Sequence, residues 1–237
     1  IKAYFDESGE RFGASKITVK LRQAGFIVSQ KHVSKLMSEM GLICKQSRLR
    51  VFNSTNRSYR YRRNRLQQNF TVDAPNKVWV SDITYMRVNE DFVSVCVIID
   101  LYARKVVSYA ISKNGNTAQV KETFQKAYDL RCPDEGLIFH SDQGTMYAAF
   151  EFRKMLRDLK VVQSFSNPGT PYDNAVAESF FSIMKREELS HNWYHTMEEL
   201  DKTISDFISF FNGYHPLQKL GNLTPDQYES LYQDSHK

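Results

Sequence analysis

VWVSDITYM at residues 78–86 and VSVCVIID at residues 93–100 are two strand-like runs rich in Val, Ile and Tyr. Apolar side chains occupy neighbouring positions in both runs, so each strand would be apolar on both of its faces. That pattern is typical of central strands in a sheet that helices cover on both sides. The polar residues Asn89 and Glu90 separate the runs, which predicts a short connection and antiparallel pairing.

The predicted elements around these runs alternate between strands and helices. Strands are expected at residues 77–88, 91–100, 105–111, 137–141 and 161–165, and helices at residues 117–130, 147–159 and 175–189. The order βββαβαβα predicts an α/β fold with a sheet of mixed strand direction, flanked by helices. The loop SNPGTPYDN at residues 166–174 is rich in turn formers and has only Tyr172 as an apolar anchor, so we expect it to be mobile.

Residues 1–43 predict a small helical domain. Two short amphipathic helices lie within residues 11–42, and the second has Ser29 as its N-cap and Gly41 as its stop. Short helices joined by a turn with glycine indicate a helix-turn-helix, although any small helical hairpin gives the same pattern. Lys31 and Lys35 of the second helix are candidates for DNA contact.

Positive charge is concentrated at the front of the chain. Residues 1–72 hold fifteen Lys and Arg against four Asp and Glu, a charge of +11, so the remainder carries −6 of the total +5. A basic segment without acidic residues suits a phosphate backbone, because the arginine guanidinium binds oxygens in pairs. RNA, an anionic membrane surface and a merely solvated linker are alternatives that charge alone does not separate. The candidates for DNA contact in this segment are Lys45, Arg48, Arg50, Arg57, Arg60, Arg62, Arg63 and Arg65.

Size and composition indicate a folded protein that works inside the cell. The 237 residues are 41% hydrophobic, enough for a core, and no run approaches the roughly 18 to 20 apolar residues that span a bilayer. Cys44, Cys96 and Cys132 are scattered and odd in number, which favours buried thiols in a reducing compartment over disulfides or a zinc site. We therefore expect a cytoplasmic protein without a membrane partner.

Two aspartates stand out by their place in the predicted sheet. Asp82 lies in the middle of an apolar strand, where a carboxylate is costly unless a cation or a donor satisfies it. Asp142 follows the run LIFHS, at the carboxyl end of a strand, where ligand sites of open α/β sheets gather. Gly144 allows the backbone to turn tightly after it. Taken singly, either aspartate could also be an ordinary hydrogen-bonded residue.

Glu178 lies in the first turn of the helix expected at residues 175–189, with Asp173 or Asn174 as its cap. At roughly 100° per residue, Glu178 and Lys185 fall on the side opposite the apolar side, so we expect both to point outward. A solvated Glu and Lys is the alternative. The three carboxylates fit a site for two divalent cations about 3.5 to 4 Å apart, and an all-oxygen donor set favours Mg²⁺, with Mn²⁺ as a substitute.

Four passages carry a resemblance to a known family: VWVSDITYM around Asp82, IIDLYARKVVSYAIS, FHSDQGTMY around Asp142, and NPGTPYDNAVAESFFSIMKREEL around Glu178. There are 35 residues between Asp142 and Glu178, and Lys185 follows the glutamate by seven. The chain thus resembles the DDE transposases of bacterial insertion sequences, in particular the catalytic OrfB portion of the family that fuses two reading frames. The closing segment FNGYHPLQKLGNLTPDQY is similar too, except that Tyr214 stands where the family usually has arginine.

The resemblance implies an RNase H-like core. We expect a helix-turn-helix domain at 1–43, a basic DNA-tracking linker at 44–69, the core at 70–190 and a helical tail at 191–237.

The resemblance further implies that Asp82, Asp142 and Glu178 are catalytic metal ligands for cleavage at the element's ends and for strand transfer by the freed 3′-hydroxyl. Lys185 would touch the terminal nucleotides. The implied partners are transposon-end DNA, target DNA, further copies of the chain that bridge two ends, and an upstream OrfA-type segment that this chain lacks.

Two other functions remain open at this stage. An inert DNA-binding regulator would keep the basic front but tolerate loss of Asp82, and an RNase H-type nuclease would not explain the basic front. A retroviral-type integrase would need a His and Cys zinc module, whose spacing is absent before residue 70.

Some residues receive secondary interpretations. His191 and His195 are four apart on an expected helix but lack the glutamate of H-E-x-x-H. Asp100 is either a fourth carboxylate near the site or a solvated strand end. Trp79 and Trp193 are interpreted as packing residues.

Overall fold

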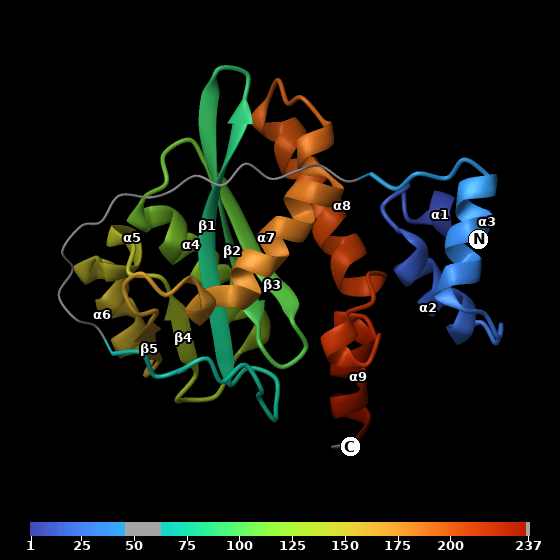
Figure 1. Ribbon diagram of the computed structural model, residues 1–237. Coiled ribbons are helices and arrows are strands. Elements are labelled where there is room, and N and C mark those ends of the chain that lie inside the picture. The colour runs from blue at the N-terminus through green and yellow to red at the C-terminus, as the bar shows by residue number, and fades with distance from the viewer. Residues whose placement is uncertain (46–62, 236–237) are drawn as a thin grey trace.

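The structure is a computed structural model that describes residues 1–45 and 63–235. Five strands form one mixed sheet in the order β3-β2-β1-β4-β5 (Figure 1). β1 pairs antiparallel with β2 and parallel with β4, while β3 continues the antiparallel side and β5 the parallel side. The predicted strands are confirmed to within one residue at each end: β1 Val78–Val88, β2 Asp91–Asp100, β3 Lys105–Ser112, β4 Ile138–Ser141 and β5 Val162–Phe165.

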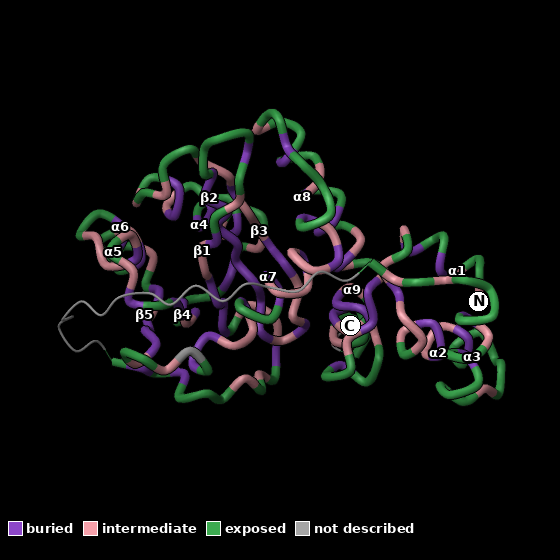
Figure 2. The backbone as a smooth tube through the Cα atoms, turned by 45° about the horizontal axis from the view of Figure 1, so that its top comes forward, coloured by how far each residue is buried: buried purple, intermediate pink, exposed green. Residues whose placement is uncertain are grey.

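Helices cover both faces of the sheet, as the doubly apolar strands predicted. The α4 face carries the three helices α4 Thr117–Arg131, α5 Thr145–Ala148 and α6 Phe150–Asp158. The opposite face carries α7 Ala175–Glu187 and α8 Met197–Gly213, and the chain ends with α9 Pro225–Ser235. In Figure 2 the strands between these two layers run largely through buried backbone.

The single helix predicted at residues 147–159 is wrong. Ala149 is extended, with φ −59° and ψ 144°, and separates α5 from α6. On a continuous helix, Tyr147 and Phe152 would point about 140° apart, because five residues turn the helix by roughly 500°. The break lets both rings enter the same core cluster, where they are 1% and 0% exposed.

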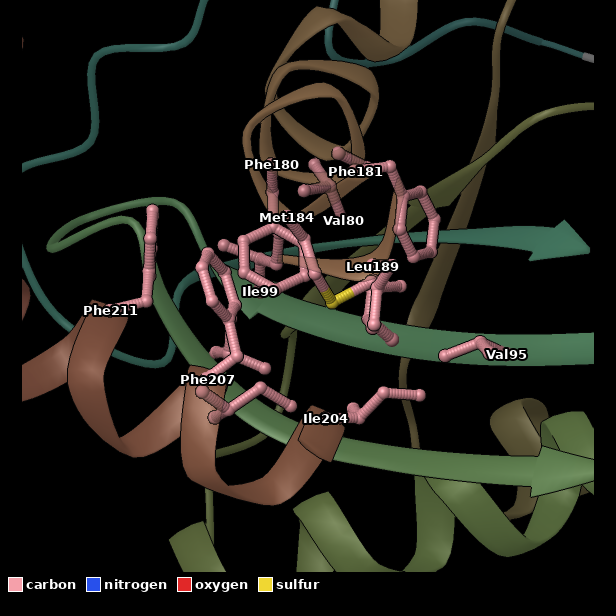
Figure 3. Close-up of a cluster of buried hydrophobic side chains, with 14 of the residues drawn as sticks. Val80, Val95, Ile99, Phe180, Phe181, Met184, Leu189, Ile204, Phe207 and Phe211 are labelled. Carbon is pink, nitrogen blue, oxygen red and sulfur yellow. The ribbon is translucent and has the colours of Figure 1, made fainter. Parts of the chain in front are cut away.

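Alternate residues of β1 enter different cores. Trp79 packs with Phe124 and Phe139 on the α4 face, which confirms its predicted packing role. Val80 faces the other way, into the cluster around α7 and α8 (Figure 3). In that cluster the α7 side chains meet the strands and the aromatic rings of α8; the residues include Val95, Ile99, Phe180, Phe181, Met184, Ile204, Phe207 and Phe211. Helix α8 is therefore part of the same core as the sheet.

The N-terminal residues form the helices α1 Lys2–Glu7, α2 Ala14–Gln23 and α3 Gln30–Glu39. The two predicted helices are confirmed, and Ser29 caps α3 by accepting a hydrogen bond from the His32 backbone N–H at 3.2 Å. The short helix α1 was not predicted. These helices share a core of Phe5, Phe12, Ile17, Leu21, Val33 and Met37.

The N-terminal core packs against the C-terminal end of α8, next to α9 in Figure 1. Phe12 stacks on Tyr214 with ring centroids 5.5 Å apart and planes at 16°, so the position where arginine was expected serves as a packing surface. Lys16 donates to Glu187 at 2.6 Å, and Glu187 also lies 3.4 Å from the His215 ring. Because Glu187 is 3% exposed and ends α7, the helix that carries Glu178 is bonded to the N-terminal helices.

Three secondary predictions are wrong. His191 ends a 3-10 turn and Asn192 is extended, so His191 and His195 do not share a helix. Trp193 is 64% exposed rather than packed, with the Arg87 guanidinium 5.6 Å above its ring. Cys132 is exposed, because it ends α4 in a left-handed conformation with φ 42°. None of the helices formed by residues 1–45 and 63–235 has the length and apolar content of a membrane span.

Candidate functional site

Strand register places Asp82 and Asp142 beside each other. Val80 of β1 pairs with His140 of β4 in a parallel ladder, and each aspartate follows its paired residue by two positions. Neighbouring strands are about 4.8 Å apart, so the two carboxylates lie on adjacent chain segments at the same level of the sheet. The positions differ in one respect: Asp82 is inside β1, whereas Asp142 is the first residue after β4.

Both aspartates face the α7 side of the sheet. Side chains alternate along a strand, and Val80 and Ile138 both belong to the cluster beneath α7. Asp82 and Asp142 have the same parity as these residues, so their carboxylates point to the same face. The fold therefore directs two acids from different strands towards one helix.

That helix supplies the third acid. α7 packs on β1 and β2 through Ala177, Phe180 and Phe181, which are at most 5% exposed. Glu178 lies next to this apolar side, in the first turn of the helix, and is itself exposed. The pKa of Asp82 shows that the other two acids lie near it. Burial is the main cause that raises this pKa to about 8, and the charges of Asp142 and Glu178 add to the rise.

The site has a partly buried base and an open rim. Asp82 is half-buried, while Asp142 and Glu178 are exposed at the rim. Partial loss of hydration raises the pKa of both rim carboxylates, and the charge of Asp142 adds to the rise at Glu178. Three carboxylates that repel one another at a solvent-accessible edge are suited to a cation and a ligand that arrives from solution.

Local contacts fix the two aspartates. Asp82 Oδ1 accepts a hydrogen bond from the Ile83 backbone N–H at 2.9 Å, and Asp142 Oδ1 accepts one from the Gly144 N–H at 2.9 Å. A Cβ atom added to Gly144 would lie 2.9 Å from Asp142 Oδ1. A side chain at this position would displace the Asp142 carboxylate, so glycine leaves room for it. The tight turn predicted here does not use the conformational freedom of glycine, because Gly144 has φ −51°.

The donor set fits a hard divalent cation. Carboxylate oxygens are the ligands that Mg²⁺ prefers, and a nearby cation would offset both the burial and the carboxylate repulsion that raise the Asp82 pKa. Within the described ranges, no three His, Cys, Asp or Glu side chains are arranged to enclose a single ion. The three acids thus share an edge without being placed to hold one ion together in this structure.

Lys185 lies closer to the site than predicted. Glu178 and Lys185 share one side of α7, but Lys185 is half-buried and its ammonium donates to the Thr84 hydroxyl. Thr84 follows Asp82 by two residues, so it faces the same side of β1. Burial lowers the Lys185 pKa and the Asp82 charge opposes that shift. Lys185 therefore connects α7 to the face of β1 that carries Asp82 instead of pointing freely outward.

A buried polar layer that the sequence analysis missed supports Asp82. Ser81 is fully buried, donates to the Val97 carbonyl at 2.8 Å and lies 2.9 Å from the Tyr147 hydroxyl. Asn174, only 4% exposed, donates through Nδ2 to the Ser81 carbonyl at 3.1 Å. The sequence signal for this layer was the presence of polar residues, such as Ser81, within the otherwise apolar passages around the acids.

The loop before α7 is held differently from the prediction. Tyr172, its expected apolar anchor, is 73% exposed, whereas Asp173 is 1% exposed and accepts three hydrogen bonds. Asn174 is the N-cap residue of α7, one of the two predicted positions, but no side chain accepts a capping hydrogen bond there. The Asp173 carboxylate is used by other residues, and the Asn174 side chain donates to the Ser81 carbonyl.

The predicted DNA-binding residues are distributed over two places. Lys31 and Lys35 are exposed on α3, and Lys35 lies 3.7 Å from Glu39. Arg63 and Arg65 have exposed side chains, while their backbones bond β5: Phe165 N–H donates to the Arg63 carbonyl at 3.2 Å, and Arg65 N–H donates to Ser164 Oγ at 2.9 Å.

The other basic candidates are less informative. Lys45 lies 3.6 Å from Glu10, next to the N-terminal helices. Five fall outside the residues that the structure describes: Arg48, Arg50, Arg57, Arg60 and Arg62.

Asp100 belongs to no site with the three acids. It is fully buried and accepts hydrogen bonds from Asn76 N–H at 2.6 Å, Tyr102 N–H at 2.9 Å and Trp79 Nε1 at 3.2 Å. Because it bonds Trp79, it faces the α4 side of the sheet. Both interpretations of Asp100, as a fourth site carboxylate and as a solvated strand end, are wrong.

Sequence comparison finds related families along most of the chain. Two family models, both described as an integrase core domain, match residues 72–171 and 159–225, and an HTH-like domain matches residues 1–50. The chain is 35% identical over 231 residues to the transposase for insertion sequence element IS904 of Lactococcus lactis, and the match covers 97% of this chain and 91% of the relative.

Comparison with solved structures gives the same fold. A chain of the simian T-cell lymphotropic virus intasome aligns with a TM-score of 0.59 and 18% identity, over 85% of this chain and 67% of that one. The catalytic core domain of HTLV-2 integrase in complex with magnesium aligns with a TM-score of 0.53 and 18% identity, over 66% and 97%. The mixed sheet flanked by helices is thus the fold of integrase catalytic cores, as expected for an RNase H-like core.

Proposed function

Because the chain belongs to the transposases of bacterial insertion sequences, enzymes with an integrase core, we propose that Asp82, Asp142 and Glu178 are its catalytic carboxylates. The reaction class follows from the family: a polynucleotidyl transferase that acts on DNA. The observation that carries the assignment is that three acids, from β1, the segment after β4 and α7, lie at one accessible edge, where the charges of Asp142 and Glu178 raise the pKa of Asp82 and the charge of Asp142 raises that of Glu178.

The carboxylates would hold divalent metal, and we propose two Mg²⁺ ions with Mn²⁺ as a substitute. The magnesium in the HTLV-2 integrase core, which shares this fold, supports Mg²⁺. Bound metal would lower the pKa of an attacking water or 3′-hydroxyl and stabilise charge on the leaving oxygen. Rim positions leave Asp142 and Glu178 accessible to phosphate oxygens of a substrate.

The proposed chemistry has two similar steps. In the first, a water oxygen attacks the phosphorus at the transposon end, the P–O3′ bond breaks, and the departing 3′-oxygen takes a proton. In the second, that 3′-hydroxyl attacks a target phosphodiester in line and displaces another 3′-oxygen. Lys185, held beside Asp82 by Thr84, would contact the terminal nucleotides, where its ammonium also offsets phosphate charge.

The proposed partners are transposon-end DNA, target DNA and further copies of this chain that bridge two ends. We propose the division predicted from the sequence: a helix-turn-helix domain at 1–43, a basic linker at 44–69, the core at 70–190 and a tail at 191–237. The exposed Arg63 and Arg65 would let DNA run along β5 to the catalytic edge. An upstream OrfA-type segment would contribute additional end recognition.

A strand-cleavage and strand-joining assay on labelled end DNA tests the proposal. Asp142→Asn is compared with wild type, and Asp158→Asn, an exposed aspartate on α6, is the matched control. We expect Mg²⁺-dependent cut and joined products from wild type and Asp158→Asn, and DNA binding without products from Asp142→Asn. Products from Asp142→Asn would contradict the assignment. Binding without cutting by wild type, with the upstream segment supplied, would favour an inert regulator.

A further inference from the structure

Asp173 is a buried carboxylate beside the site that the proposed chemistry does not use. It precedes Glu178 by five residues and lies in the 3-10 turn Pro171–Asn174 that leads into α7. At 1% exposure, an aspartate is retained only where hydrogen bonds replace its hydration. Its partners therefore indicate what it holds in place.

Those partners come from two separate segments. Asp173 Oδ2 accepts from Asn64 Nδ2 at 2.8 Å and from the Asn167 backbone N–H at 2.7 Å, and Oδ1 accepts from Gln68 Nε2 at 2.8 Å. Asn167 belongs to the loop before α7, whereas Asn64 and Gln68 lie about a hundred residues earlier, at the end of the basic linker. One carboxylate thus joins that linker end to the start of the catalytic helix.

The neighbouring residue extends the connection to Asp82. Asn174 donates to the carbonyl of Ser81, which directly precedes Asp82 in β1. The Asp173–Asn174 pair therefore fixes the entry of α7 to the linker end on one side and to β1 on the other. Glu178 follows Asn174 by four residues, about one helical turn, so a shift of this entry would move the Glu178 carboxylate.

We propose that Asp173 is a positioning residue that holds Glu178 in its place and couples it to the end of the basic linker. This inference rests on the proposed role of Glu178. Arg63 and Arg65 flank Asn64 and are exposed. DNA phosphates bound by these two arginines would therefore contact the same segment that is hydrogen-bonded to Asp173. The segment that presents Arg63 and Arg65 beside β5 is thereby joined to the entry of α7, so DNA bound at this segment lies at a fixed position relative to Glu178.

The linker side of the contact offers a test with a closely matched control. Asn64→Ala with Gln68→Ala removes two of the three hydrogen bonds to Asp173, together with the local bond from the Gln67 N–H to Asn64 Oδ1, and leaves every site residue intact. Gln67→Ala with Asn69→Ala removes the same residue types from the same segment, and neither of those side chains bonds Asp173. Gln67 and Gln68 have similar positive φ angles, 49° and 59°, so alanine is strained equally in both variants.

The readouts are end-DNA cleavage at saturating DNA, the DNA dissociation constant, and the Mg²⁺ concentration that gives half-maximal cleavage. For Asn64→Ala with Gln68→Ala we expect cleavage to fall at least tenfold and the Mg²⁺ requirement to rise, with DNA affinity within twofold of wild type. The control pair is expected to match wild type in all three. Equal cleavage by both double variants would overturn the inference, as would an equal loss in both.

Direct substitution of Asp173 provides a second line. Asp173→Asn keeps an oxygen for Asn64 and Asn167, and Gln68 can rotate its amide, so we expect most of the cleavage that Asp173→Ala loses to return. Asp100→Ala loses three accepted hydrogen bonds on the other face of the sheet and controls for stability alone. If Asp100→Ala and Asp173→Ala lose cleavage equally, Asp173 is merely structural. Failure of the catalytic assignment is separate, because it appears as cleavage by Asp142→Asn.

Discussion

Replacing Asp82 with Asn should stabilise the metal-free fold while it abolishes catalysis. The pKa of Asp82 is raised to about 8 in the folded chain, against about 3.9 for an unfolded aspartate. Between these values the folded state keeps a proton that the unfolded state releases, so the free energy of unfolding falls as pH rises, by up to ~1.4 kcal/mol per pH unit. Asp82→Asn lacks this penalty.

The magnitude follows from the pH range. Three units between pH 5 and pH 8 give an upper limit of ~4 kcal/mol, and because Asp82 is only half-buried, solvent screening reduces our expectation to about 2 to 4 kcal/mol. Asparagine keeps an oxygen for the Ile83 N–H, so no hydrogen bond need be lost. The advantage of Asp82→Asn over wild type should therefore grow steadily from pH 5 to pH 8.

Urea unfolding in a chelator, at each pH unit from 5 to 8, measures this difference. Asp158→Asn serves as the control, because its carboxylate is exposed beside Lys154 and should leave the pH dependence unchanged. Added Mg²⁺ should stabilise wild type and leave Asp82→Asn unaffected, because bound metal replaces the proton. A stability difference that stays constant from pH 5 to pH 8 would refute the argument that burial and the neighbouring carboxylates raise the Asp82 pKa.

Three further predictions concern the rest of the chain. Glu187→Gln should lower the free energy of unfolding by about 2 to 4 kcal/mol in urea, because it leaves the half-buried Lys16 ammonium without its carboxylate partner. Glu122→Gln on the surface of α4 should change the free energy of unfolding little. Lys185→Met should reduce end-DNA cleavage about tenfold in a gel assay, and Lys185→Arg should reduce it less. If the Met variant cleaves like wild type, the role of Lys185 is limited to its structural bond with Thr84. The logarithm of the end-DNA affinity should fall with the logarithm of the salt concentration with a slope near −5 to −7, as expected if about six to eight phosphates are neutralised. A slope shallower than about −2 would exclude the basic linker as a major contact with DNA.

The sheet could be predicted from the sequence because its signal is local. Runs of Val, Ile and Tyr set off by turn residues fixed the strands to within a residue, and apolar residues on both faces indicated the two helical layers. The placement of Asp82 and Asp142 followed from strand position alone. Their register across β1 and β4 is a tertiary property that the structure supplies.

The wrong predictions have a common cause: a local sequence pattern does not show which distant residues a side chain will contact in the folded chain. Asp173 looked like a helix cap, but Asn64 and Gln68, distant in the sequence, use its carboxylate. Lys185 seemed solvent-facing because helical periodicity does not include Thr84 on β1. Trp193 is large and apolar, yet its ring remains at the surface beneath Arg87.

Lys45 and Arg63 are each secured to a different part of the fold. Lys45 N–H donates to the Glu10 carbonyl at 2.9 Å among the N-terminal helices, and the Arg63 carbonyl accepts from Phe165 at the end of β5. The N-terminal helices are joined to the core by Lys16 and Glu187, independently of the intervening residues. Insertions or deletions between positions 45 and 63 would therefore leave the spacing of the three carboxylates unchanged, so the length of this segment and the geometry of the site can vary independently as the sequence diverges.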